Sequence, residues 1–296
     1  MVRVYLDTMG GDHPEENLKA IDFFKENTEK ENAEKENTEK DQTEVEKTGN
    51  PNKKYDDLEI IPVYGKDGFD SIEKAYISLK TDGSPSALVS MGDTKSLVIG
   101  AMNHIGMTNG IVRPPFCPVI STFDGNPVGI CDSGAIINPA PEYLLQYAKL
   151  GSEYMRSVYD IEKPRVGLLN IGTEEDKGDK LHREAHELLK ACTDINFEGN
   201  MESREFLSGK FDLVVCDGFS GNVMLKAIEG VGEGLLRRIY KYLPKEELQF
   251  MNYHNYGGSA LLGVKKPVIK VHGSSDAIAV SVAIEQAYKY AKALNY

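Results

Sequence analysis

Two kinds of segment alternate along the chain. Seven short runs are rich in Val, Ile and Leu, which is typical of parallel strands that are covered on both faces. These predicted strands span residues 2–7, 58–63, 87–90, 129–131, 165–171, 213–216 and 268–271. Amphipathic stretches between them predict helices at residues 71–80, 141–158, 181–192, 222–242 and 276–294. The repeated strand-then-helix order predicts an α/β fold with a parallel sheet and helices on both of its sides.

One segment lacks either pattern. Residues 25–39 contain three copies of a five-residue repeat (KENTE, KENAE, KENTE), and residues 40–44 carry an altered fourth copy. A period of five matches neither a helix nor a strand, so the tract offers no apolar face to bury. We therefore expect a charged insertion at about residues 25–54, either solvated and flexible or forming a frayed helical extension.

Composition restricts the possible partners and the compartment. The 296 residues carry a net charge of -12, so the chain lacks the basic surface that nucleic-acid binding requires. No secretory signal pattern precedes the first strand, and no apolar run approaches the ~18 residues of a membrane-spanning helix. The four cysteines are far apart and lack the spacing of a metal or redox motif. These features predict a cytoplasmic protein with reduced cysteines and no nucleic-acid partner.

Five predicted strands run into polar loops that contain glycine or serine. The loops are residues 7–13, 92–94, 172–178, 217–222 and 272–276. In an open parallel sheet, ligands bind outside the carboxyl ends of the strands, so we expect these loops on the same edge of one sheet. Backbone N–H groups at a helix start can converge on an anion, although a single loop of this kind can equally be a tight turn with a cap. Five together predict a site for a small anion such as phosphate or a carboxylate.

Other chemistries have weaker support. No Gly-x-Gly-x-x-Gly follows the first strand and no Walker motif is present, so nucleotide cofactors are disfavoured. A serine-hydrolase elbow is also absent. His182 and His186 lie four residues apart on a predicted helix, which is a spacing that can chelate a metal. Without a third ligand or an H-E-x-x-H motif, we expect a solvated helix face there, with no metal and no cofactor.

Several of these stretches resemble the bacterial phosphate acyltransferases of phospholipid synthesis, the PlsX family. The matching runs are residues 7–13 (DTMGGDH), 164–175 (PRVGLLNIGTEE), 217–222 (DGFSGN), 256–258 (YGG) and 270–276 (KVHGSSD). They occur in the right order, and the match covers residues 86–293 and about the first twenty. The resemblance implies a three-layer α/β/α sandwich, similar to isopropylmalate dehydrogenases and phosphotransacetylases, as one domain over residues 1–296.

The resemblance also implies an activity. The family transfers a fatty acyl group from acyl carrier protein to inorganic phosphate, without an organic cofactor, usually as a homodimer. The product, an acyl phosphate, serves a glycerol-phosphate acyltransferase downstream. Lys177 and Asn222 are the candidates for orienting phosphate and stabilising the transition state, and His13 or His272 for protonating the leaving thiol. The other candidate substrate-binding and phosphate-binding residues are Asp7, Gly10, Gly11, Asp12, Thr94, Asn170, Glu174, Gly221, Lys226, Gly257, Gly258, Gly273, Ser274 and Ser275.

The chain departs from the family pattern in four places. Lys95 stands where the family has a glycine, and Ile136 stands where it has an asparagine that can form hydrogen bonds. A basic pair before Ser71 is missing, and the helical hairpin at about residues 229–253 is short, which argues against contact with a membrane. Three hypotheses follow: an acyltransferase that uses acyl carrier protein, a phosphotransacylase that uses acyl-CoA or another thioester, and a binding protein without catalysis.

Overall fold

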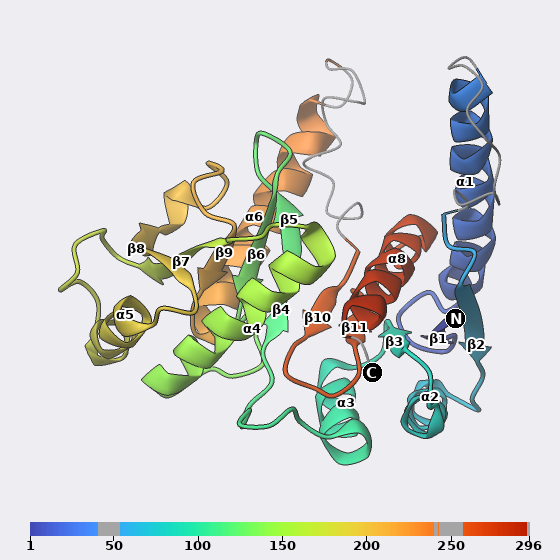
Figure 1. Ribbon diagram of the computed structural model, residues 1–296, viewed down its shortest axis with the longest axis horizontal. Helices are drawn as coiled ribbons and strands as arrows, with labels where there is room; N and C mark the ends of the chain where they lie inside the picture. The colour runs from blue at the N-terminus through green and yellow to red at the C-terminus, as the bar shows by residue number, and fades with distance from the viewer. Residues whose placement is uncertain (41–53, 240–241, 243–256, 295–296) are drawn as a thin grey trace.

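The computed structural model describes residues 1–40, 54–239, 242 and 257–294. Within these residues the strands form two sheets, whereas the sequence predicted that the five polar loops share one (Figure 1). The first sheet has the order β2-β1-β3-β11-β10-β4 and the second has the order β5-β6-β9-β7-β8. The strands of the first sheet are β1 (Val2–Asp7), β2 (Leu58–Val63), β3 (Ser86–Ser90), β4 (Phe116–Cys117), β10 (Ser259–Leu261) and β11 (Val268–Lys270). Those of the second are β5 (Val119–Ser121), β6 (Pro127–Cys131), β7 (Arg165–Asn170), β8 (Asn196–Glu202) and β9 (Leu213–Val215).

Most neighbouring strands are parallel, as predicted. The antiparallel pairs are β10 with β11, β10 with β4, and β5 with β6. The polar loops after β1, β3 and β11 therefore belong to the first sheet, and those after β7 and β9 belong to the second. The expectation of one shared edge was wrong, because the pattern of a strand does not specify its pairing partner.

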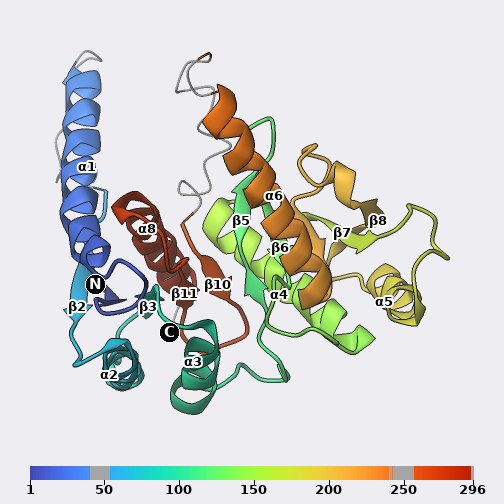
Figure 2. The same ribbon diagram turned by 180° about the vertical axis from the view of Figure 1, so that it is seen from behind.

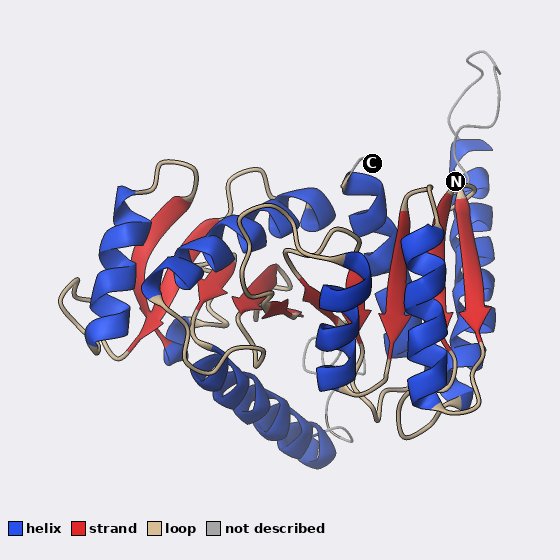
Figure 3. Cartoon of the chain, turned by 90° about the horizontal axis from the view of Figure 1, so that it is seen from below, coloured by secondary structure: helices blue, strands red, loops and turns tan. Residues whose placement is uncertain are grey.

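Helices cover both faces of each sheet, as Figure 3 shows. They are α1 (Glu15–Lys40), α2 (Gly68–Thr81), α3 (Thr94–Gly100), α4 (Pro141–Tyr159), α5 (Lys180–Ala191), α6 (Gly218–Ile239) and α8 (Ala277–Ala293), with short helical turns at Ala101–Ile105 and Ser203–Glu205. Strand alternation produces the layers: Val4 and Leu6 of β1 pack with α8, whereas Tyr5 between them packs with α2. The predicted three-layer α/β/α arrangement is confirmed.

One apolar core joins the two sheets. It contains Leu6 and Val89 from the first sheet and Val166 and Leu213 from the second, together with buried side chains of α4 and α8. A second, smaller cluster lies between the second sheet and α6, where Met224 and Leu225 are buried. Figure 2 shows α6 lying against the second sheet, where it contacts β6. The buried positions of α6 fix which of its faces remains open toward the first sheet.

The charged repeat is helical in its described part. Helix α1 continues through residues 25–39, as one of the two expectations stated (Figure 1). Its base is held by aromatic contacts, because the Phe24 ring lies 5.1 Å from that of Tyr55, which lies 5.1 Å from that of Tyr288. Residues 41–53 of the insertion, and residues 240–241 and 243–253 of the shortened hairpin, lie outside the described residues. Among the helices that are described, none is long and apolar enough to cross a bilayer.

Candidate active site

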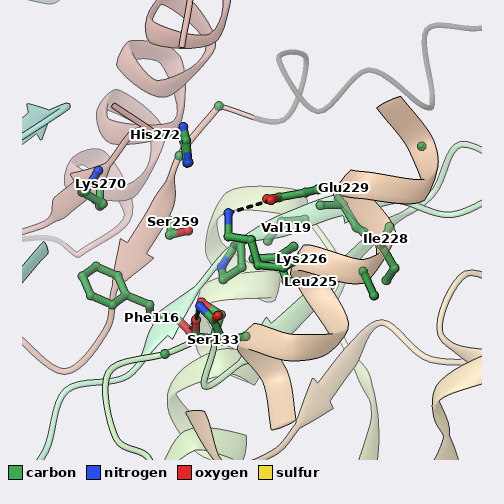
Figure 4. A pocket seen from close by; sticks show the side chains of 18 of the residues that line it. Phe116, Val119, Ser133, Leu225, Lys226, Ile228, Glu229, Ser259, Lys270 and His272 are labelled. Carbon is green, nitrogen blue, oxygen red and sulfur yellow. Dashed lines mark hydrogen bonds and ion pairs between the residues drawn. The ribbon is translucent and has the colours of Figure 1, made fainter. Parts of the chain in front are cut away.

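A cavity of about 850 Å³ lies between α6 and the ends of β10 and β11 (Figure 4). Both sheets contribute to its wall, because α6 and β5 belong with the second sheet and β10 and β11 with the first. Polar side chains gather on one side of it: Ser133, Asn222, Lys226, Ser259, Lys270 and His272. Apolar side chains that line it include Val119, Ile120, Leu207, Leu225, Ile228, Val231 and Leu235. The size and this division are typical of a site for a ligand with one polar and one apolar end.

Helix α6 presents three polar side chains to the cavity. Asn222, Lys226 and Glu229 are four and three residues apart, so they lie on one face of the helix. The Lys226 Nζ lies 2.6 Å from the Glu229 Oε2, and Figure 4 shows this pair beside the polar side of the cavity. The Asn222 Nδ2 donates to the carbonyl of Ser133 at 3.1 Å. The helix therefore brings an amide, an ammonium and a carboxylate to one wall.

The start of α6 depends on a buried carboxylate. Asp132 is fully buried and accepts N–H bonds from residues 116, 134, 135 and 136, so it shapes the loop that carries Ser133. Burial raises the pKa of the Asp132 carboxyl, and these N–H bonds oppose that shift. A Cβ at Gly221 would lie 2.0 Å from the Asp132 carbonyl oxygen, so only glycine lets α6 approach this loop. Gly221 thus acts through close packing and does not line the cavity.

The opposite wall carries two further basic groups on and after β11. Burial lowers the pKa of Lys270 to about 8, and among the nearby charges Asp93 raises it while Lys226 lowers it. Burial also lowers the pKa of His272, with Lys226 and Lys270 acting in the same direction. The His272 Nδ1 lies 2.8 Å from the Ser274 Oγ and 3.3 Å from the Ser274 backbone nitrogen, so Ser274 holds the ring in place. Lys226, Lys270 and His272 together make the polar side attractive to an anion.

Carboxylates occupy several of the helix-start N–H groups for which the sequence predicted anion binding. At α6, the Asp217 Oδ1 accepts the N–H groups of Phe219 and Ser220, both at 2.9 Å. At α8, Asp276 accepts the N–H of Ala279, and the Glu16 carboxylate accepts that of Ala277. These N–H groups are therefore already paired with carboxylates. The basic groups that line the cavity are the side chains of Lys226, Lys270 and His272.

The loop after β1 supports the site from behind. The Asp7 carboxylate is fully buried and accepts hydrogen bonds from Ser71 Oγ at 2.5 Å and Ser90 Oγ at 2.6 Å. The Asp12 N–H donates to the Gly273 carbonyl at 2.7 Å, so this loop packs against the loop after β11. His13 is exposed and its Nδ1 lies 3.7 Å from Glu15. Of the two candidate histidines, His272 lines the cavity and His13 does not.

The loop after β7 forms a separate cluster. The Asn170 Nδ2 donates to the Lys177 carbonyl at 3.1 Å, and the Lys177 N–H donates to the Glu174 carbonyl at 3.1 Å. The Lys177 Nζ lies 3.9 Å from a Glu174 carboxylate oxygen. None of these three residues lines the cavity. Because β7 pairs in parallel with β9, the loop lies at the same strand end as the start of α6.

One histidine differs from the expectation. His186 is 2% exposed and its Nδ1 lies 3.0 Å from the Asn200 Oδ1, so the predicted solvated face was wrong for this residue. Asn200 in turn donates to the Glu174 carbonyl at 2.6 Å, which ties α5 and β8 to the Lys177 loop. His182 pairs instead with Asp179. Among the described residues no cluster of three potential metal ligands forms.

The structure thus divides the predicted site residues into two groups. Those that line the cavity are Thr94, Asn222, Lys226, Gly257, Gly258, His272, Gly273 and Ser275. Those that do not are Asp7, Gly10, Gly11, Asp12, His13, Asn170, Glu174, Lys177, Gly221 and Ser274. Sequence reasoning missed Lys270, Ser133, Ser259 and Glu229. The sequence contained a cue for two of them. Lys270 begins the run KVHGSSD, and Glu229 follows Lys226 at a helical spacing.

Comparison with known proteins decides the family. A family model described as "Fatty acid synthesis protein" matches residues 70–294. A phosphate acyltransferase from Shouchella clausii is 34% identical, over 97% of this chain and 94% of the relative. Another, from Halalkalibacterium halodurans, is 36% identical over 97% of this chain and 92% of the relative. The chain belongs to the phosphate acyltransferase (PlsX) family. The predictions of the family and of an enzyme are confirmed.

A solved structure supports the fold. EutD phosphotransacetylase from Staphylococcus aureus superposes with a TM-score of 0.60, covering 98% of this chain and 94% of that protein, at 15% identity. At such low identity the likeness concerns the fold alone. It confirms the predicted phosphotransacetylase-like fold.

Proposed function

We propose that this enzyme transfers a fatty acyl group from a thioester to inorganic phosphate and so forms an acyl phosphate. The observation that carries the proposal is a cavity in which a cationic side meets an apolar wall. Lys226, Lys270 and His272 suit an anion, and the side chains that surround Leu225 and Val231 suit a hydrocarbon chain. A ligand with both parts is an acyl group next to phosphate.

The chemistry balances within the reactants. An oxygen of the dihydrogen phosphate monoanion attacks the thioester carbonyl and forms a C–O bond, and collapse of the tetrahedral intermediate breaks the C–S bond. The departing thiolate needs one proton, and the attacking phosphate gives up one. We assign the transfer of this proton to His272, which lines the cavity and whose lowered pKa keeps the ring neutral and able to accept it.

The remaining roles follow from position. Lys226 and Lys270 hold phosphate, and the Asn222 amide stabilises the oxyanion that develops on the thioester carbonyl. Lys177 does not line the cavity, and we keep its assignment to transition-state stabilisation from the family resemblance, with its loop at the same strand end as the start of α6. Since both sheets contribute to one cavity, we treat residues 1–296 as one catalytic unit with no cofactor.

The donor and partners are proposed from the family resemblance. We propose acyl carrier protein as the donor, a homodimer in the cytoplasm as the working form, and a glycerol-phosphate acyltransferase as the consumer of the product. An acyl-CoA donor is the alternative that the missing basic pair favours, because carrier proteins are acidic and prefer basic surfaces.

Two departures from the family pattern do not close the cavity. Lys95 is exposed, and neither Lys95 nor Ile136 lines the cavity. The backbone of Ile136 has a structural role, because its N–H donates to Asp132 at 2.7 Å and its carbonyl accepts the Gly218 N–H at 2.8 Å. These contacts need no side-chain amide. The hypothesis of a binding protein without catalysis therefore loses its structural support.

The test measures thiol release from palmitoyl-acyl carrier protein with and without inorganic phosphate, and traps the acyl phosphate with hydroxylamine. We expect phosphate-dependent release that Asn222→Ala reduces on the order of a hundredfold. Lys74→Met is the control. The Lys74 Nζ lies 2.7 Å from a carboxylate oxygen of Asp70, also on α2, and neither residue lines the cavity. Palmitoyl-CoA is tested in parallel. Faster turnover of the CoA ester would reject the carrier-protein donor, and no release from either ester would reject the function.

A further inference from the structure

The cavity contains a carboxylate that an anion site would not be expected to include. Among its described lining residues Glu229 is the one acidic side chain. It lies on the same face of α6 as Lys226, and its Oε2 lies 2.6 Å from the Lys226 Nζ. Glu229 is less exposed than Lys226, at 27% against 48% of the side chain. A bound anion that contacts Lys226 must therefore lie close to a negative charge.

The geometry of the Lys226 ammonium group limits how far a bound anion can lie from the Glu229 carboxylate. Lys226 has three N–H donors in tetrahedral directions, and Glu229 occupies one of them. Two oxygens on neighbouring donors of one ammonium are about 4–5 Å apart. An anion at Lys226 can therefore turn one of its own oxygens toward the Glu229 carboxylate. Whether that contact attracts or repels depends on whether the oxygen carries a proton.

Phosphate and sulfate differ in this respect. At neutral pH inorganic phosphate retains at least one P–OH group, whereas sulfate has no proton and can only accept hydrogen bonds. An ionised carboxylate also only accepts. A P–OH group would donate a charge-assisted hydrogen bond to Glu229, and a sulfate oxygen at the same place would be repelled.

We propose that Glu229 is the residue that makes this cavity select protonated phosphate over sulfate, by accepting a hydrogen bond from the P–OH group while Lys226 holds the anion. This inference rests on the proposed function, in which phosphate binds at Lys226. The other carboxylates near the basic groups, those of Asp12 and Asp93, do not line the cavity. Asp93 accepts both the N–H and the hydroxyl of Ser96, and the Asp12 oxygens lie beside Gly273 outside the cavity. Among the described lining residues, Glu229 is therefore the one carboxylate that an anion held by Lys226 would meet.

The test measures the binding of inorganic phosphate and of sodium sulfate to the full-length chain by calorimetry, at pH 7 and constant ionic strength. We expect wild type to bind phosphate about tenfold or more tightly than sulfate. Glu229→Gln has nearly the same shape, but its amide N–H groups can donate to sulfate, so we expect the ratio to fall to about threefold or less. Glu229→Ala should lower the ratio as well, because it removes the negative charge.

The matched control is Glu233→Gln. Glu233 forms an ion pair with Arg237 at 2.5 Å, about one turn further along α6, and neither residue lines the cavity. The Glu233→Gln variant should keep the wild-type ratio of phosphate affinity to sulfate affinity. A wild-type ratio in Glu229→Gln, or a wild-type protein without preference for phosphate, would overturn the inference. Because the measurement requires no turnover, selective binding without acyl transfer would reject only the proposed function, and acyl transfer with an unchanged ratio would reject only this inference.

Discussion

Lys177 and Lys226 are similar residues in different surroundings. Both side chains are about half exposed, and sequence analysis placed both at the anion site. Lys226 lines the cavity from α6, whereas Lys177 lies in the loop after β7 and outside the cavity. Helix α6 follows β9 and the Lys177 loop follows β7, and these two strands are neighbours in the second sheet. A shared strand edge therefore does not by itself bring residues to one cavity, because the cavity forms only where α6 faces the first sheet.

The largest expected effect is a fall in kcat, and it distinguishes Lys177, which acts on the chemical step, from Lys226, which acts on phosphate binding. Lys177→Ala should lower kcat on the order of a hundredfold, because we assign Lys177 to the transition state, while the phosphate Kd stays within twofold of wild type. Single-turnover kinetics and calorimetry with phosphate check this. If Lys177→Ala weakened phosphate binding as much as a change at Lys226 does, the two lysines would share one role and the comparison would fail.

Lys226→Met should act mainly on binding. It removes a charged donor from the cavity, so we expect the phosphate Kd to rise about tenfold to a hundredfold, as for the loss of a hydrogen bond to a charged group. The measurement is a phosphate titration of the full-length protein, with Lys74→Met as the control. A phosphate Kd within twofold of wild type would place the phosphate elsewhere than beside Lys226.

Gly178→Ala should disturb the Lys177 loop alone. Gly178 has φ +91, and a Cβ there would lie 2.7 Å from the Asn170 Oδ1, so the loop must shift. We expect kcat to fall about tenfold and the free energy of unfolding to fall by about 1–2 kcal/mol, with the phosphate Kd unchanged. Gly83→Ala is the control, because no atom lies within 4 Å of the added Cβ. A loss of phosphate binding in Gly178→Ala would show that the two regions are coupled.

The smallest effect concerns pH. The Lys270 pKa of about 8 means that its ammonium is charged below this pH and neutral above it. The phosphate Kd should therefore rise about threefold to tenfold between pH 7 and pH 9. Calorimetric titrations across this range check the direction, and Lys270→Met should flatten the profile. An unchanged slope in Lys270→Met would assign the pH dependence to another group, such as the phosphate itself.

The Lys270 pKa also has a consequence for stability. In the unfolded chain this lysine titrates near 10.4, so between about pH 8 and 10 the unfolded state binds the proton more tightly than the folded state does. Over that window Lys270 should make the folded state relatively more stable as pH rises. The difference in free energy of unfolding between wild type and Lys270→Met, measured by urea titration, should therefore shift in favour of wild type from pH 8 to pH 10.

Local patterns predicted most of the helices and strands, but they did not predict strand β8 or the burial of His186. Strand β8 escaped notice because its sequence, NFEGNME, contains no apolar run, and it is held by pairing with β7. His186 seemed a surface residue from its helical spacing, but the packing of α5 against β8 buries it beside Phe197. In both cases the deciding contact lies outside the segment. Sequence periodicity reports only which side of an element is apolar, and not what covers it.

The sequence determined the order of strands and helices, the small residues that let α6 pack closely, and the motifs that identify the family. These features depend on neighbours within a few residues, so a local pattern is enough to reveal them. Tertiary structure decided which loops meet. Lys270 and Lys226 line one cavity because β11 pairs with β3 and β10 with β4, over separations of far more than a hundred residues in sequence. Such pairings depend on the whole core, and for that reason Glu229 and Lys270 join the site only once the chain has folded.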